Sequence, residues 1–244
     1  MKNIVAVIPA RYESSRFPGK PLAMINNKPM IQWVYEKVKR VDGIKDIYVA
    51  TDDNRILNTV KNFGGKAIMT SSSHKSGTDR INEAISKIDS NIDIVLNIQG
   101  DEPMINTEMI RALISAFNDE SVYMATLKKR LYSKEDIENP NIAKVITDIY
   151  ENAIYFSRST IPFNRDNRED IKYFKHIGVY GYTKNFLKKF SSLSQGKLEQ
   201  LEQLEQLRAI ENGYNIRVIE TDYDSIGVDL PKDISKVEYL INGR

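Results

Sequence analysis

Three cations gather in one short loop near the start of the chain. The stretch ARYESSRFPGKPL, residues 10–22, follows the apolar run NIVAVIP and contains Arg11, Arg16 and Lys20. Because like charges repel, such a cluster favours a bound anion, although a solvated basic loop is the simpler alternative. Arginine holds phosphate through paired hydrogen bonds, and lysine supplies a point charge. The loop therefore predicts a site for a polyphosphate.

The loop matches neither of two common phosphate-binding motifs. A Walker A loop requires G-x-x-x-x-G-K-[ST], but here Pro21 follows Gly19 and Lys20, and no G-x-G-x-x-G follows a predicted strand. What is left is a looser cradle, in which Gly19, Ser14 and Ser15 let the backbone approach the phosphates closely.

Two further apolar runs end in carboxylates. NIQGDEP, residues 97–103, places Asp101 and Glu102 after a predicted strand, and IGVDLP, residues 226–231, places Asp229 after an apolar run with a glycine. Mg²⁺ takes one or two protein carboxylates and completes its shell with phosphate oxygens and water. The spacing alone leaves two alternatives open. These aspartates bind metal, or they belong to ordinary turns, with the start of a helix as the simpler interpretation of Asp229.

The segment SSSHKSGTDR, residues 71–80, lies between a predicted strand and a predicted helix. Its small hydroxyl residues, its glycine and its two cations could bind a base or a ribose, whereas Asp79 could equally be the N-cap of the helix. The two histidines, His74 and His176, are too few for a histidine-based metal site, and no Ser-His-Asp arrangement stands out. For His176, an ordinary strand histidine is an equal alternative.

The elements that must position these residues follow from the hydrophobic pattern. Short apolar runs predict buried strands over 3–9, 46–51, 66–70 and 93–99. Apolar residues three and four apart predict helices over 28–40, 54–63 and 79–88. Strands alternating with helices imply βαβ units, so we expect an α/β fold with a doubly wound, mostly parallel sheet. Ligands of such sheets bind at the carboxyl ends of the strands, where the basic loop begins.

The pattern changes after about residue 120. VYMATLKK, AKVITDIY, AIYFS and a strand over 173–183 favour antiparallel pieces, which we interpret as a sheet-rich insertion over roughly 120–195. The segment 196–213 predicts a single helix closed by Gly213, with a leucine at every third position from Leu198 to Leu207 on its core face. A strand and a helix end the chain. Because no Pro/Gly/Ser-rich linker separates the halves, we expect one domain over 1–244.

Composition excludes several classes of function. The 244 residues are 41% hydrophobic and carry a net charge of +2, with no charge block long enough for a nucleic-acid arm. The absence of cysteine excludes disulfides, thiolate chemistry and cysteine-based zinc sites. The N-terminal apolar run is too short for a signal peptide, and no run approaches the roughly 18 apolar residues of a membrane span. We expect a soluble, cytoplasmic protein whose ligand is a small anion rather than a nucleic acid or a membrane.

The chain as a whole resembles one family. Its motifs IPARYESSRFPGKPL, ATDD, HKSGTDR, IQGDEPMI, YFSRSTIPFNRD, KHIGVYGY, LEQLEQLR and GVDLPKD occur in the order and spacing of the 3-deoxy-manno-octulosonate cytidylyltransferases, or CMP-Kdo synthetases. The resemblance covers nearly all residues. The related sialate cytidylyltransferases typically carry Gly-Gly-Ser where this chain has Tyr12, Glu13 and Ser14, which favours the Kdo branch.

The resemblance implies an activity, a cofactor and an assembly. The family converts CTP and Kdo into CMP-Kdo and pyrophosphate with Mg²⁺, in lipopolysaccharide biosynthesis. Its fold is the doubly wound fold of nucleotide-diphospho-sugar transferases, and its members are usually homodimers. We expect the insertion to contribute to the sugar site and the dimer interface. In this chemistry the anomeric C2 hydroxyl of the sugar attacks the α-phosphorus in line, so no protein nucleophile is needed.

Motif matching carries the family's site onto numbered residues. The residues expected to bind the nucleotide are Ala10, Arg11, Ser15, Lys20, Ser76, Gly77, Thr78, Arg80 and Asp101. The expected metal ligands are Asp101 and Asp229. The residues expected to line the sugar pocket are Gln99, Arg158, His176, Tyr180, Glu205 and Gln206. Catalysis is expected to rest on Arg11, Lys20, Asp101 and Asp229.

Three departures leave the substrate open. Leu230 stands where the family usually has Thr, so a hydroxyl near Asp229 is lost. GKLEQLEQ and DSIG are similar to enzymes that activate 8-amino-3,8-dideoxy-manno-octulosonate, although that branch often has Gln at the position of Glu102. The alternatives are therefore the same chemistry on this or another acidic sugar, an enzyme of this fold that uses another nucleotide, and a non-catalytic nucleotide sensor. The presence of both Asp101 and Asp229 argues against the sensor.

Overall fold

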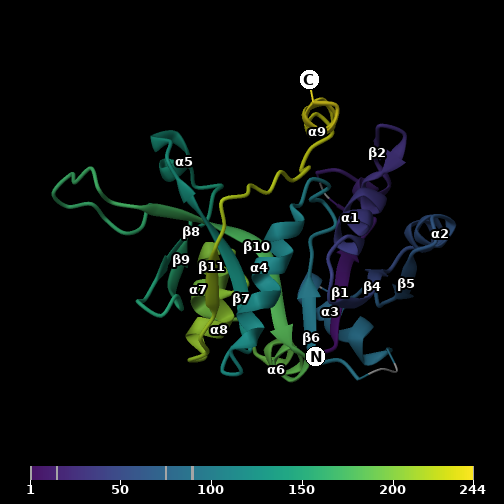
Figure 1. Cartoon of the computed structure of the whole chain (residues 1–244), viewed down its shortest axis with the longest axis horizontal. Helices are drawn as coiled ribbons and strands as arrows, with labels where there is room; N and C mark the ends of the chain where they lie inside the picture. The colour runs from purple at the N-terminus through teal and green to yellow at the C-terminus, as the bar shows by residue number, and fades with distance from the viewer. Residues whose placement is uncertain (1, 15, 75, 89–90, 244) are drawn as a thin grey trace.

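The computed structural model describes residues 2–14, 16–74, 76–88 and 91–243 (Figure 1). One large sheet runs through it in the order β11-β7-β10-β6-β1-β4-β5. Along this path only β10 runs antiparallel to its neighbours. The mostly parallel sheet predicted from the sequence is therefore confirmed. Its strands are β1 (Ile4–Ala10), β4 (Ile44–Thr51), β5 (Lys66–Met69), β6 (Ile94–Asn97), β7 (Met124–Leu131), β10 (Tyr173–Thr183) and β11 (Arg217–Glu220).

Helices cover both faces of the sheet, which is why β1 is apolar on both sides. Ala6 and Ile8 of β1 belong to a core with α1 (Met30–Lys39), α2 (Asn54–Asn62) and α4 (Thr107–Ser115). Val5 and Val7 belong to a second core with α3 (Gly77–Ser86), α6 (Lys184–Ser192) and α8 (Leu207–Glu211). The doubly wound architecture is thus confirmed.

The single helix predicted over 196–213 is wrong. The chain forms α7 (Lys197–Glu202) and α8, separated at Gln203, whose φ of 53° lies in the left-handed region. The break lets Glu199 of α7 form a buried ion pair with Arg208 of α8, at 2.8 and 2.5 Å. It also turns Leu201 outward, where it is 80% exposed, so Leu201 leaves the predicted core face. Leu198, Leu204 and Leu207 still pack in the core, as predicted.

The segment predicted as an insertion joins the sheet in part. Its strands β7 and β10 pair with each other inside the main sheet, and β10 also pairs with β6. A hairpin of β8 (Lys144–Thr147) and β9 (Ala153–Ser157) is attached through the pairing of β8 with β10. This hairpin, α5 (Lys134–Glu138) and the loop that follows β9 lie on one flank, from which the loop projects (Figure 1).

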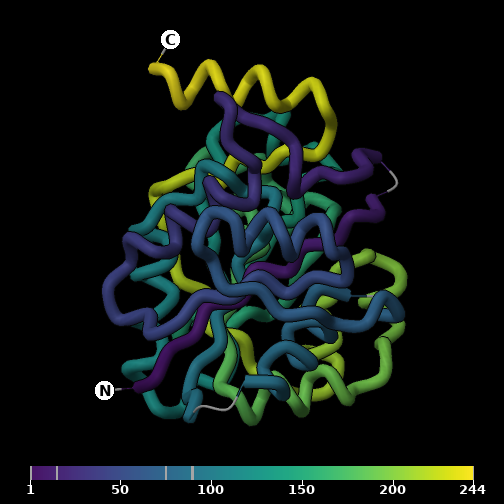
Figure 2. The backbone as a smooth tube through the Cα atoms, turned by 90° about the vertical axis from the view of Figure 1, so that its right-hand side faces the viewer, coloured from purple at the N-terminus to yellow at the C-terminus, as the bar shows by residue number. Residues whose placement is uncertain are grey.

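The C-terminal part returns across the carboxyl edge of the sheet. After β11, residues 221–232 form an extended connection, here called the strap, that leads to α9 (Asp233–Ile241). Figure 2 shows α9 over the N-terminal segment that holds η1 (Lys20–Leu22), β2 (Met24–Ile25) and β3 (Lys28–Pro29). Asn26 donates hydrogen bonds of 2.9 Å to Glu238 of α9 and of 3.0 Å to Asn242, the C-cap of that helix. Among the described residues, no helix is both long enough and apolar enough to cross a membrane.

Candidate active site

A cavity of about 290 Å³ opens at the carboxyl edge of the sheet, between the ends of β1 and β6, the start of α3 and the strap. Most residues predicted to bind nucleotide or metal line it, although they come from four distant parts of the chain. The predicted residues on its wall are Ala10, Arg11, Lys20, Ser76, Gly77, Arg80, Gln99, Asp101 and Asp229. Ser15, which was also predicted to bind phosphate, lies outside the described residues.

Lys20 links the two aspartates that were predicted to bind metal. Its ammonium nitrogen lies 2.6 Å from Oδ2 of Asp101 and 3.7 Å from Oδ1 of Asp229. The guanidinium of Arg16 lies 3.1 Å from the same oxygen of Asp229. Cations of the basic loop and carboxylates 128 positions apart in the sequence therefore meet on one wall of the cavity.

Two glycines shape this wall. The basic loop is closed by a hydrogen bond of 2.8 Å from the Gly19 amide to the carbonyl of Tyr12, and Gly19 has a φ of 69°, which a glycine adopts without strain. At the end of β6, a Cβ on Gly100 would lie 2.9 Å from the carbonyl oxygen of Pro9. Only glycine lets the chain after β6 pass this close to β1, so Asp101 follows at the edge of the cavity.

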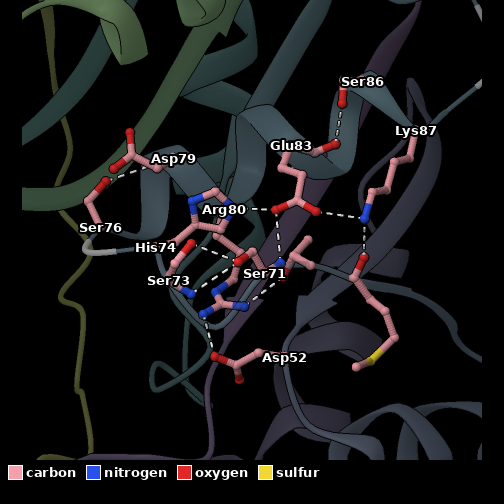
Figure 3. Close-up of polar contacts among 12 residues, drawn as sticks. Asp52, Ser71, Ser73, His74, Ser76, Asp79, Arg80, Glu83, Ser86 and Lys87 are labelled. Carbon is pink, nitrogen blue, oxygen red and sulfur yellow. Dashed lines mark hydrogen bonds and ion pairs between the residues drawn. The ribbon is translucent and has the colours of Figure 1, made fainter.

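The loop before α3 is fixed by the helix itself, as Figure 3 shows. Ser76, not Asp79, is the N-cap of α3, because its Oγ accepts a hydrogen bond of 3.1 Å from the Asp79 amide. Glu83 reaches back to accept a hydrogen bond of 2.9 Å from the Ser71 amide and to contact Nε2 of His74. Hydrogen bonding from Lys87 is the main cause that lowers the pKa of Glu83 to about 2. An ionised Glu83 thus holds His74 on the cavity wall.

Arg80 and Thr78 have structural partners in addition to their place near the cavity. The buried guanidinium of Arg80 donates to Oγ1 of Thr70 at 2.6 Å and to Asp52 at 2.7 Å, which joins α3 to the ends of β4 and β5. Thr78 is not among the described residues that line the cavity. Its hydroxyl donates to Glu205 at 2.8 Å, so Thr78 connects the predicted nucleotide residues with the predicted sugar residues.

His176, Tyr180 and Gln206, three of the predicted sugar residues, form one polar cluster. The Tyr180 hydroxyl donates to Gln206 at 3.1 Å, and Gln206 lies 3.5 Å from Nδ1 of His176. Nε2 of His176 lies 3.0 Å from Oγ1 of Thr126. Burial lowers the pKa of His176 to about 3 and raises that of Tyr180, so both are neutral near pH 7. Gln99, which lines the cavity, donates to the carbonyl of Gly178 on β10 at 3.1 Å, whereas none of the three cluster residues is on the described cavity wall.

The other two predicted sugar residues differ in their surroundings. Burial raises the pKa of Glu205, and its Oε1 has no hydrogen-bond partner among the described residues, although Arg208 lies 3.5 Å away. Arg158 is turned toward α7, where its Nε donates to the carbonyl of Glu202 at 2.8 Å and its Nη1 to that of Pro140 at 3.2 Å. Within the described part of the chain, Arg158 is not on the cavity wall.

The match to known proteins identifies the family. A family model described as cytidylyltransferase matches residues 5–220. The chain belongs to the cytidylyltransferase family. A relative from Syntrophus aciditrophicus (strain SB), named 3-deoxy-manno-octulosonate cytidylyltransferase, is 50% identical over 100% of this chain and 99% of its own. One from Shewanella sp. (strain W3-18-1), named 8-amino-3,8-dideoxy-manno-octulosonate cytidylyltransferase, is 51% identical with 97% of each chain covered. A solved CMP:2-keto-3-deoxy-manno-octonic acid synthetase complexed with CTP has a TM-score of 0.94 at 45% identity, with 99% of each chain covered.

This cytidylyltransferase has cavity residues that the motif comparison did not assign. Arg16 was visible in the basic loop, and the signal for it was its charge beside Arg11 and Lys20. His74 and Ser14 also line the cavity, and the only sequence signal for them was a polar residue type within a quoted motif. Glu83 gave no signal, because a glutamate on a helix surface is common and its reach back to the preceding loop appears only in three dimensions.

The carboxylate pair fits Mg²⁺ in the chemistry of its donors. Among the described residues, no group of three or more His, Cys, Asp or Glu side chains could hold a metal ion. Asp101 and Asp229 supply hard oxygen ligands, and Mg²⁺ is commonly held by one or two such groups with phosphate oxygens and water. Glu102 does not join them, since it is absent from the cavity wall and burial raises its pKa to about 7.

Proposed function

We propose that this protein transfers CMP from CTP to the anomeric C2 hydroxyl of Kdo and releases pyrophosphate. The observation that carries the proposal is the meeting of Arg11, Arg16 and Lys20 with Asp101 and Asp229 on one cavity wall at the carboxyl edge of the sheet. A cytidylyltransferase fold, and relatives named for CMP transfer to octulosonates, support the same reaction.

The cations would bind and neutralise the triphosphate. Arg11 and Arg16 can each offer paired donors, and Lys20 a compact charge, to oxygens on which negative charge grows as pyrophosphate leaves. Asp101 and Asp229 would hold Mg²⁺, which when bound neutralises charge on the phosphates. Lys20 and Arg16 now pair with these same aspartates, so a metal-bound triphosphate would give every charged group a partner of opposite sign.

The acceptor sugar would be held by uncharged hydrogen-bonding groups. Neutral His176, Tyr180, Gln206 and Gln99 can donate to or accept from several hydroxyls, which suits a polyhydroxylated sugar. Relatives named for Kdo and for its 8-amino analogue are almost equally similar to this chain. The 8-amino sugar is therefore the second candidate acceptor, with the same chemistry at C2.

The direct test is pyrophosphate release from CTP and Mg²⁺ with Kdo, 8-amino-Kdo and sialate compared side by side. We expect release with Kdo, none with sialate, and loss of release when Mg²⁺ is chelated. Faster release with 8-amino-Kdo would make that sugar the substrate. Release with none of the three sugars would overturn the proposed function.

We also propose that the protein is a homodimer that pairs through the flank built by β8, β9 and the loop after them. Apolar side chains are exposed there, which is unusual for a surface that faces only water. The exposed residues are Ile149, Tyr150, Ile154 and Phe163.

A further inference from the structure

Asp224 lies in the strap and bridges two lysines on neighbouring strands. Its Oδ2 lies 3.0 Å from the ammonium of Lys129 on β7, and its Oδ1 contacts that of Lys175 on β10. Burial alone would raise the pKa of Asp224, but hydrogen bonds from Lys175 and Lys129 outweigh burial and lower it. The carboxylate is therefore ionised when it joins the strap to the sheet.

The two lysines need such an anion. Lys129 and Lys175 are directly opposite each other in the register of β7 and β10. Like charges at opposed positions of antiparallel strands destabilise the pair. Both side chains are largely covered, so water screens their repulsion less than it would at an open surface. Asp224 offsets this repulsion, and its attraction to both lysines holds it in place.

Beyond Asp224 the strap runs to the metal-binding edge. The Val228 amide donates to the carbonyl of Asp101 at 2.9 Å, and the Val228 side chain is buried in a small core with Ile25 and Val237. The amide of Asp229 is fixed from the other side by Asp233, whose Oδ2 accepts it at 2.9 Å. Asp229 thus follows two upstream anchors, Asp224 and Val228, and precedes a downstream one, Asp233.

The side chain of Asp229 does not fix its own position. It is 58% exposed, its partner Arg16 is 66% exposed, and its other partner, Lys20, lies 3.7 Å away, close to the distance limit of an ion pair. Exposed ion pairs of this kind contribute little, typically about 0–1 kcal/mol. The place of the carboxylate next to Asp101 must therefore come from the backbone of the strap.

We infer that Asp224 is a positioning residue, which holds the strap so that Asp229 lies beside Asp101 at the cation loop. The inference rests on the proposed function only in taking Mg²⁺ as the ion that these aspartates bind. The link through backbone geometry holds whatever the acceptor sugar is.

The test compares Asp224→Asn with Asp119→Asn in the full chain. Asp119 is a matched control, because it pairs with Arg217 at 3.2 Å at the opposite end of β11, away from the strap. Hydrogen exchange of the peptide that contains Val228, followed by mass spectrometry in protein without Mg²⁺, measures how often the strap opens. The Mg²⁺ concentration that gives half the maximal rate measures the effect of this opening on metal binding.

We expect Asp224→Asn to speed exchange of that peptide about tenfold, because the strap opens more often. The half-maximal Mg²⁺ concentration should also rise, by a smaller factor, because the apparent affinity falls only as the fraction of protein with a closed strap falls. The rate at saturating Mg²⁺ should recover to within about threefold, since no group that contacts substrate is lost. Asp119→Asn should change neither readout. Adding Lys129→Met to Asp224→Asn should restore the melting temperature, by relieving repulsion, but not the slow exchange.

Two results would overturn the inference. If exchange near Val228 and the Mg²⁺ requirement stay unchanged in Asp224→Asn, the carboxylate only neutralises the lysines. If adding Lys129→Met to Asp224→Asn restores slow exchange, repulsion between the lysines, and not the anchoring of the strap by Asp224, controls how often the strap opens. Failure of the proposed function can be distinguished from failure of this inference, because hydrogen exchange can be measured even in a protein that is inactive with CTP.

Discussion

Lys20 stands between Asp101 and Asp229, so each carboxylate has a cationic partner before any metal is considered. Replacing either aspartate by Asn keeps its shape and removes one charge. We expect turnover to fall about 100-fold or more, by analogy with the loss of one preorganised electrostatic contact. Stability should change by roughly 1 kcal/mol or less, because the lost ion pair is partly exposed.

Rates at a series of Mg²⁺ concentrations, together with thermal melts, check this prediction. Extra Mg²⁺ should restore part of the rate if weakened metal binding is the cause. Asp46→Asn is the control, since Asp46 pairs with Lys66 outside the cavity. Wild-type turnover in both site variants would remove these aspartates from the mechanism.

The neutral state of His176 gives stability a defined pH dependence. Burial lowers its pKa in the folded protein from 6.5 to about 3. Between these values the unfolded chain binds a proton that the native protein does not, so protons favour unfolding. We expect the free energy of unfolding to fall as pH drops below about 6.5, with a contribution of up to roughly 1.4 kcal/mol per pH unit.

Urea unfolding at pH 5, 6 and 7 measures this slope. His176→Gln has no group that titrates there, so its slope should be smaller by the contribution of one proton. Equal slopes in the two proteins would show that His176 is not held neutral by burial.

At the scale of elements, the break between α7 and α8 depends on the buried pair of Glu199 and Arg208. Breaking such a pair leaves an uncompensated buried charge, so we expect Arg208→Met to lower the free energy of unfolding by about 3–5 kcal/mol. Glu199→Met combined with Arg208→Met should recover only part of the loss, because apolar replacement of a buried pair is often near neutral but Glu205 still loses Arg208, which lies 3.5 Å away. Urea unfolding of the single and double variants measures both effects.

Lys134→Met provides the comparison, since Lys134 pairs with Glu138 at 3.7 Å on an exposed face of α5. A loss with Arg208→Met as small as that with Lys134→Met would mean that the pair does not hold the two helices together.

The same pair shows why the sequence predicted some of these elements and missed the break. The apolar pattern predicted β1, β4, α1 and α2 correctly as strands and helices. Each helix buries one continuous apolar face, and β1 buries both of its faces. The leucines at every third position from Leu198 also looked like one helix. The break comes from a charge pair nine positions apart, Glu199 and Arg208, and no local apolar period records it.

At the scale of the whole molecule, the candidate site is assembled by topology rather than by local sequence. The sequence alone could place Arg11 and Asp101 at the same edge of the predicted sheet, and the parallel pairing of β1 with β6 in the structure makes the ends of these two strands neighbours. Asp229 could not be placed in this way, since the strap that brings it there has no repeating pattern. Its position was expected only from the family's motifs, and the contact of Lys20 with both aspartates agrees with that expectation.

Assembly is the remaining property of the whole molecule. The proposed homodimer flank exposes Ile149 by 88% and Phe163 by 85%, on segments that lie apart from the cavity wall. Burying such side chains in an interface is worth roughly 1.5–3 kcal/mol each, so a charge at these positions should separate the subunits. We expect light scattering to give twice the chain mass of 28.0 kDa for the wild type. Ile149→Asp combined with Phe163→Asp should give the mass of one chain.

Tyr239→Asp tests whether the flank, rather than exposed apolar surface in general, is responsible. Tyr239 is also exposed, but it lies on α9 over the N-terminal segment, away from the hairpin (Figure 1). Since only the flank is expected to pair, Tyr239→Asp should keep the dimer mass. A wild type with the mass of one chain would contradict the proposed dimer, and dissociation by Tyr239→Asp alone would move the interface to α9.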